Sequence, residues 1–224
     1  MPHLPEATGP EGKTSLTHLE TKKILLLGES TIAGIGVKTH QEGLAGQLAQ
    51  GLAEQLHYNI DWKVIAKSGF TTKKVTQRLV PQISPDPLDL IVIGLGGNDT
   101  FTLNTRWSRD IKDLIYQLRL IQPACPLLFI NLPPVGEFPA LPSILRFCLD
   151  NHMDKLRAQL IDIVQKETDC YFISDKITLK EWSTKFGLEN KVELYFSDGI
   201  HPEKLTYQIW GQSVAEFICK EKLI

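Results

Sequence analysis

The chain alternates between short apolar runs and longer stretches in which apolar residues recur every three or four positions. The short runs are typical of buried parallel strands, and we predict five of them, at 23–27, 60–65, 88–95, 126–132 and 171–174. The longer stretches predict helices with one apolar face at 41–56, 71–80, 108–121, 142–167 and 205–220. Because right-handed crossovers join such strands, the alternation predicts an α/β fold with a five-stranded parallel sheet and helices on both faces.

The first 21 residues interrupt this pattern because they are polar, carry Pro and Gly, and contain no apolar run. We predict a flexible N-terminal tail at 1–21, which is not a signal peptide, and one domain at 22–224. No stretch approaches the roughly 20 apolar residues that a membrane span needs. We therefore expect no membrane span and a cytoplasmic location, or a place in the cell envelope if a hydrophobic anchor precedes the chain.

The composition narrows the function classes. The 224 residues are 42% hydrophobic and 22% charged, which suffices for one full core. The net charge of -2 leaves no basic surface for a nucleic acid partner. Four cysteines without C-x-x-C spacing, and histidines without partners at ligand spacing, predict no metal and no cofactor. The cysteines are expected to be small core residues, while a disulfide and the oligomeric state stay open.

A candidate nucleophile, Ser30, comes two residues after the first predicted strand. In parallel sheets, ligands bind at the carboxyl ends of the strands, so Ser30 should share one rim with the residues that follow the next two strands, Gly69 and Asn98. The Ser30 and Gly69 N–H groups and the Asn98 amide are suited to stabilise an oxyanion. The simpler interpretations are a helix cap for Ser30 and turn chemistry for Asn98.

A candidate base follows in the segment Asp198-Gly199-Ile200-His201-Pro202. An Asp three residues before a His can accept from the imidazole Nδ1–H and leave Nε2 free to take a proton from a serine. The alternative is an ordinary turn with a surface histidine. We expect the pair to act on Ser30, with activity falling as His201 becomes protonated at acidic pH.

Candidate pocket residues lie in a proline-stiffened loop after the fourth strand and next to the nucleophile. We expect Val135, Phe138 and Leu141, together with Thr31, to wall an acyl pocket. The alternative is a loop that only covers the core.

These motifs, in this order, resemble the SGNH (GDSL-type) hydrolases, and Pro133 to Pro142 resembles a bacterial esterase/lipase-like branch of that family. The resemblance implies a flavodoxin-like three-layer α/β/α fold, an acyl-enzyme and no metal. It assigns Ser30 as the nucleophile, Asp198 and His201 as the rest of the triad, and Gly69 and Asn98 as oxyanion donors. Two positions depart from the family pattern, namely Glu29 for the usual Asp and Thr31 for the usual Leu.

The expected function is a serine esterase that acts on short- or medium-chain esters of small molecules. A lysophospholipase or thioesterase, or a carbohydrate O-deacetylase, would use the same triad. A non-catalytic nucleotide- or ligand-binding flavodoxin-like module is the alternative of another class, although Asp99 would place a carboxylate in its phosphate loop. The G-x-S-x-G elbow of α/β-hydrolases is absent around Ser30.

Overall fold

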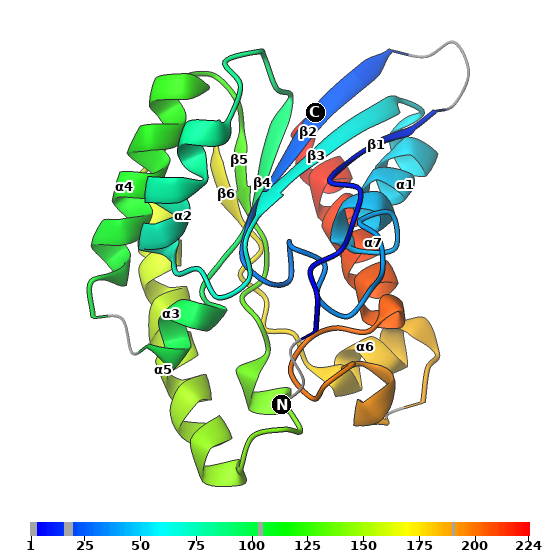
Figure 1. The fold of residues 1–224 in the computed structure, drawn as a ribbon, viewed down its shortest axis with the longest axis vertical. Helices are drawn as coiled ribbons and strands as arrows, with labels where there is room; N and C mark the ends of the chain where they lie inside the picture. The colour runs from blue at the N-terminus through cyan, green and yellow to red at the C-terminus, as the bar shows by residue number, and fades with distance from the viewer. Residues whose placement is uncertain (1–3, 16–19, 103–104, 190) are drawn as a thin grey trace.

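The computed structural model describes residues 4–15, 20–102, 105–189 and 191–224. A six-stranded sheet lies between two layers of helices (Figure 1). Its strand order is β1-β3-β2-β4-β5-β6, and only β1 is antiparallel to its neighbour. The strands are β1 (Glu11–Thr14), β2 (Thr21–Gly28), β3 (Asn59–Ala66), β4 (Leu90–Gly94), β5 (Leu127–Phe129) and β6 (Cys170–Phe172).

The parallel part of the sheet, β3-β2-β4-β5-β6, has the strand order of flavodoxin-like folds. The predicted three-layer α/β/α fold is therefore confirmed, and each of the five predicted strands is present. The strand count needs a correction, because the sheet has a sixth strand, β1, at its edge.

The flexible tail predicted at 1–21 is also corrected for residues 4–15, which pack on the domain. β1 pairs with β3, and further upstream the Ala7 N–H donates to the Ala33 carbonyl at 3.0 Å. The His40 N–H donates in turn to the Thr8 carbonyl at 2.9 Å. These contacts use backbone groups, which explains why a polar segment without hydrophobic periodicity is ordered here.

The helices divide between the two faces of the sheet, and Figure 1 shows α1 and α7 on one side and α2, α4 and α5 on the other. Alternate side chains of β2 enter the two cores, with Ile24 and Leu26 facing α1 and α7, and Leu25 and Leu27 facing α2 and α4. The helices are α1 (Leu44–Leu56), α2 (Thr72–Arg78), α3 (Gly97–Phe101), α4 (Trp107–Ile121), α5 (Ser143–Val164), α6 (Leu179–Phe186) and α7 (Lys204–Glu221).

Short 3₁₀ helices complete the chain at Val80–Gln82 (η1), Val135–Glu137 (η2) and Val192–Leu194 (η3). All five predicted helices are present, while α3 and α6 were not predicted. Among the described residues, no helix combines the length and the apolar character that a membrane crossing requires.

Candidate active site

Ser30 lies in a tight turn (residues 29–36, the Ser30 turn) that begins where β2 ends. The turn is closed by a hydrogen bond from the Ile35 N–H to the Ser30 carbonyl at 3.2 Å. Gly28, the last residue of β2, is required by close packing, because a Cβ there would lie 2.1 Å from the Gly94 carbonyl oxygen of β4. The sharp exit from the sheet leaves Ser30 partly exposed at the carboxyl end of the strands.

Asp198 and His201 form a hydrogen-bonded pair in the loop that precedes α7 (residues 196–202, the His201 loop). Asp198 Oδ2 lies 2.8 Å from His201 Nδ1, and Asp198 Oδ1 accepts from the N–H groups of Ile200 at 3.0 Å and His201 at 2.8 Å. Burial alone would raise the pKa of Asp198, but the hydrogen bonds from His201 and Ile200 outweigh it and lower the pKa. The carboxylate therefore holds the imidazole with Nε2 directed away from it.

The Ser30 turn and the His201 loop lie side by side. A Cβ at Gly36 would meet the Pro202 carbonyl oxygen at 2.1 Å, and the Tyr207 hydroxyl of α7 donates to a carbonyl of the Ser30 turn at 2.8 Å. The structure therefore brings Ser30 and His201 to the same rim. Within the described residues, no hydrogen bond joins the side chains of Ser30 and His201.

Two of the three predicted oxyanion donors are free. Neither the Ser30 N–H nor the Gly69 N–H has an acceptor within the described chain. Gly69 has a φ of +78°, and no atom lies within 4 Å of a Cβ placed there, so its backbone faces open space. The Asn98 amide is engaged, because Nδ2 donates to Glu29 Oε2 at 2.5 Å and to the Phe70 carbonyl at 3.1 Å.

Glu29, which the sequence left without a role, is the centre of a buried polar cluster below Ser30. Its carboxylate accepts from the Gly97 N–H at 2.7 Å and from the Asn98 N–H at 3.0 Å, in addition to the Asn98 amide. The neighbouring Asp99 carboxylate is also buried and accepts from the N–H of Thr72 at 2.9 Å and from its hydroxyl at 2.7 Å. The two carboxylates therefore tie α3, which carries Asn98, to the end of β2 and to α2.

Glu6 is a second residue that the sequence reasoning missed, because it lies in the segment predicted to be flexible. Its carboxylate accepts from the Ser68 N–H at 2.8 Å and pairs with Lys67 Nζ at 3.0 Å. Both partners directly precede Gly69. The N-terminal segment thereby braces the turn that carries a predicted oxyanion donor.

A narrow apolar cavity with a free volume of about 20 Å³ adjoins the two loops. Thr31 and Phe138, two of the residues predicted to wall an acyl pocket, line this cavity. Val135 does not, because it is fully buried in the core where η2 packs on α5, which corrects the prediction for this residue. Leu141 is half-buried against the same core and is not among the lining residues. The remaining walls come from both sides of the sheet's end: Pro133, Pro134, Ile177, Leu179, Trp182, Phe196, Ile200, Pro202, Thr206 and Trp210.

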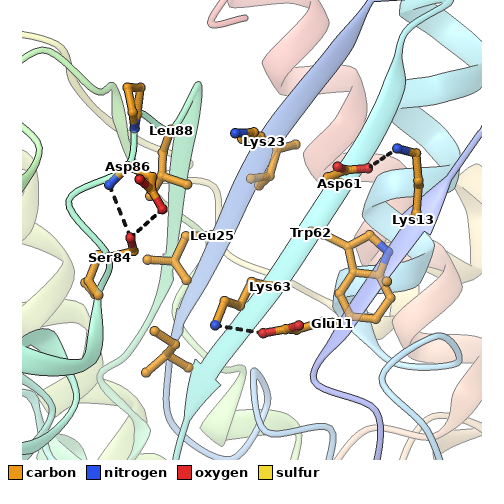
Figure 2. A pocket seen from close by; sticks show the side chains of 15 residues that line it. Glu11, Lys13, Lys23, Leu25, Asp61, Trp62, Lys63, Ser84, Asp86 and Leu88 are labelled. Carbon is orange, nitrogen blue, oxygen red and sulfur yellow. Dashed lines mark hydrogen bonds and ion pairs between the residues drawn. The ribbon is translucent and has the colours of Figure 1, made fainter.

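A larger groove of about 530 Å³ lies elsewhere, near the start of β2 (Figure 2). Four of its charged side chains form two ion pairs, Lys63 with Glu11 at 2.7 Å and Lys13 with Asp61 at 3.2 Å. None of the predicted site residues lines it. The groove is therefore separate from the candidate active site, despite its size.

The cysteines offer no competing nucleophile in the core. All four are free thiols, and burial raises the pKa of Cys125 and of Cys170 to about 12, which suppresses the reactive thiolate. Cys148 is exposed and Cys219 is half-buried. Among the residues that the structure describes, no three His, Cys, Asp or Glu side chains are grouped so that they could hold a metal ion.

Known proteins resemble this chain at the level of the family and of the fold. The model of the GDSL-like lipase/acylhydrolase family matches residues 26–209, which include the Ser30 turn and the His201 loop. No curated protein matches the chain significantly.

Solved structures share the fold at low sequence identity. The structure of TesA superposes with a TM-score of 0.66 at 18% identity, covering 91% of this chain and 100% of the other. A family 3 carbohydrate esterase from Clostridium thermocellum gives 0.65 at 17% identity, covering 90% and 97%. Phospholipase A1 from Streptomyces albidoflavus NA297 gives 0.60 at 14% identity, covering 91% and 99%. With the family model matching most of its length, the chain belongs to the GDSL-like lipase/acylhydrolase family and is a hydrolase of ester bonds.

Proposed function

We propose that the protein is a serine esterase that hydrolyses short-chain acyl esters through an acyl-enzyme on Ser30. The observation that carries this proposal is the Asp198–His201 pair at 2.8 Å, in a loop packed against the Ser30 turn. In the first step the Ser30 hydroxyl attacks the ester carbonyl and its proton passes to His201 Nε2. His201 then returns that proton to the departing alcohol as the carbon–oxygen bond of the ester breaks.

The second step is hydrolysis of the acyl-enzyme. Water loses a proton to His201 and attacks the acyl carbonyl, and the bond to Ser30 Oγ breaks as the proton returns to that oxygen. In this mechanism the N–H groups of Ser30 and Gly69 stabilise the oxyanion of each step, and their lack of an acceptor among the described residues supports this role. Asp198, with its lowered pKa, stabilises the imidazolium in both.

The narrow cavity supports the choice of short acyl groups. Its free volume of about 20 Å³ holds about one water molecule, so a long chain does not fit without movement of its walls. Phe138→Leu should widen it and raise the preference for butyrate over acetate esters by about tenfold or more, since each methylene in an apolar pocket is worth about tenfold or more. Phe172→Leu on β6 is the matched control. An unchanged preference in a folded Phe138→Leu protein would exclude the pocket.

Esters of lipids are a second candidate, favoured by exposed apolar side chains near the rim. Ile144, Leu145 and Phe147 are exposed on the first turns of α5. They follow the loop in which the Ala140 N–H donates to the Gly199 carbonyl at 3.2 Å, so they adjoin the His201 loop. Hydrolysis of lysophospholipid or thioester, but not of small esters, would favour this candidate.

Fluorophosphonate labelling tests the proposal directly. Wild-type protein should be modified at Ser30, and Ser30→Ala should abolish both labelling and ester hydrolysis. A panel of acyl esters, thioesters and acetylated sugars then defines the substrate class. Hydrolysis that persists in Ser30→Ala would overturn the proposal.

A further inference from the structure

Glu29 is a buried carboxylate that is hydrogen-bonded to the first two residues of α3. It is 2% exposed, and its two oxygens accept three hydrogen bonds, from two consecutive backbone N–H groups and from the Asn98 amide. An ionised carboxylate is an acceptor only, whereas a protonated one carries an O–H that must donate. A proton on Glu29 therefore removes the negative charge that strengthens all three contacts and one acceptor site, and it adds an O–H that none of these three donors can accept.

The contact most sensitive to protonation of Glu29 is the hydrogen bond from the Asn98 side-chain amide. Its Nδ2 divides two hydrogens between Glu29 Oε2 at 2.5 Å and the Phe70 carbonyl at 3.1 Å. The backbone donors of Gly97 and Asn98 are held by α3, whereas the Asn98 amide is on a rotatable side chain and depends on these two hydrogen bonds for its orientation. Protonation of Glu29 would thus weaken the hydrogen bond that orients the Asn98 amide, which is a predicted oxyanion donor.

The surroundings of Glu29 make both charge states accessible. Burial raises its pKa from 4.5 to about 7, the donors of Gly97 and Asn98 act against this, and the Asp99 carboxylate adds to the rise. Asp99, on α3, is the charged group that acts on Glu29 among the described residues. It is itself buried and bonded to Thr72.

We propose that Glu29 is a positioning residue for ester hydrolysis, whose ionised carboxylate orients the Asn98 amide and whose protonation converts the site to a slower form. This inference rests on the proposed role of Ser30 as nucleophile. It gives the acidic side of the pH–rate profile two ionisations, one from His201 as the base and one from Glu29.

The test is the rate constant for fluorophosphonate modification of Ser30, measured from about pH 5 to about pH 9. This reaction requires the nucleophile and the oxyanion donors but no knowledge of the natural ester. The wild-type profile should need two ionisations on its acidic side, with the protonated Glu29 form about tenfold slower or more. Glu29→Gln should need only one, and Glu54→Gln, an exposed change of the same kind on α1, should match wild type.

Two further variants keep the test decisive if Glu29→Gln folds poorly. Glu29→Asp retains an ionisable group and should retain both ionisations. Asp99→Asn removes the neighbouring charge and should move only the Glu29 ionisation to lower pH. Profiles of the same shape in wild type, Glu29→Gln and Asp99→Asn would overturn the inference while leaving Ser30 as nucleophile. Absence of labelling in wild type would instead overturn the proposed function.

Discussion

Two carboxylates support the rim of this protein, and they respond to similar hydrogen bonding in opposite ways. Asp198 in the His201 loop and Glu29 below Ser30 each accept three hydrogen bonds, two of them from consecutive backbone N–H groups. The pKa of Asp198 is nevertheless lowered, whereas that of Glu29 is raised to about 7. The number of hydrogen bonds therefore does not decide the charge state.

The difference lies in depth and in the charge of the neighbour. Asp198 faces His201, which becomes a cation during the reaction, while Glu29 is desolvated beside the anionic Asp99. The two carboxylates therefore change the stability of the fold with pH in opposite directions. Asp198 stabilises the fold above its unfolded pKa, and this contribution is lost as pH falls. Glu29 binds its proton more tightly when folded, so stability declines as pH rises from about 4.5 to about 7.

The largest expected effect comes from Asp198, the carboxylate that is hydrogen-bonded to His201. Asp198→Asn should lower kcat by about 10⁴-fold, because the amide no longer holds the imidazole in the required tautomer or stabilises its charge. Steady-state hydrolysis of a small acyl ester measures this, with Asp162→Asn on α5 as an exposed control. A loss of less than about tenfold would remove Asp198 from the triad.

Asn98 connects the two carboxylates in function. Its amide is hydrogen-bonded to Glu29 and is expected to act in the same reaction as the Asp198–His201 pair. Asn98→Ala should lower kcat by about 10² to 10³-fold if the amide reaches the oxyanion in the transition state. Thr102→Ala at the end of the same helix is the matched control. A change below about threefold, in a folded protein, would mean that the amide serves only to bind Glu29.

The buried carboxylate can be tested through stability alone. A pKa rise from 4.5 to about 7 corresponds to about 3 kcal/mol, at about 1.4 kcal/mol for each pKa unit. Relative to wild type, the unfolding free energy of Glu29→Gln should therefore increase by up to about 3 kcal/mol between about pH 4.5 and about pH 8. Urea denaturation across this range measures the difference. A constant difference would show that Glu29 titrates alike in the folded and unfolded chains.

The smallest effect is expected at Glu6, which braces the Gly69 turn from the N-terminal segment. Glu6→Ala should reduce kcat several-fold, about two- to tenfold, because one charge-assisted hydrogen bond to the Ser68 N–H is lost. Glu11→Ala on β1, which removes the exposed ion pair with Lys63 of β3, should leave kcat unchanged. If Glu6→Ala and Glu11→Ala have the same kcat, the contact between Glu6 and the Gly69 turn does not contribute to catalysis.

The fold was largely predictable from the sequence because buried strands and amphipathic helices carry a hydrophobic period. The rule that sites form at the carboxyl ends of parallel strands placed Ser30 and Gly69 on one rim. β1 was missed because Glu11–Thr14 joins the sheet through backbone hydrogen bonds, which leave no apolar pattern. α6 was missed because its eight residues are too few for a clear period.

The details of the site depend on contacts that sequence patterns do not encode. Val135 belongs to the core and not to the pocket, since the turn of η2 directs it toward α5. Glu29 meets its partners because β2 and β4 are neighbouring strands, so that the Gly97 N–H after β4 lies 2.7 Å from the Glu29 carboxylate after β2. A charged residue directly after a buried strand was the available signal for Glu29.

The measurement closest to the central claim is direct capture of the acyl-enzyme. Wild-type protein is mixed with an activated short-chain ester, quenched in acid within the first turnover, digested and analysed by mass spectrometry. The acyl group should lie on Ser30 and should be absent from Ser30→Ala. Ester hydrolysis with no acyl adduct on Ser30, or with the adduct on another residue, would contradict the account.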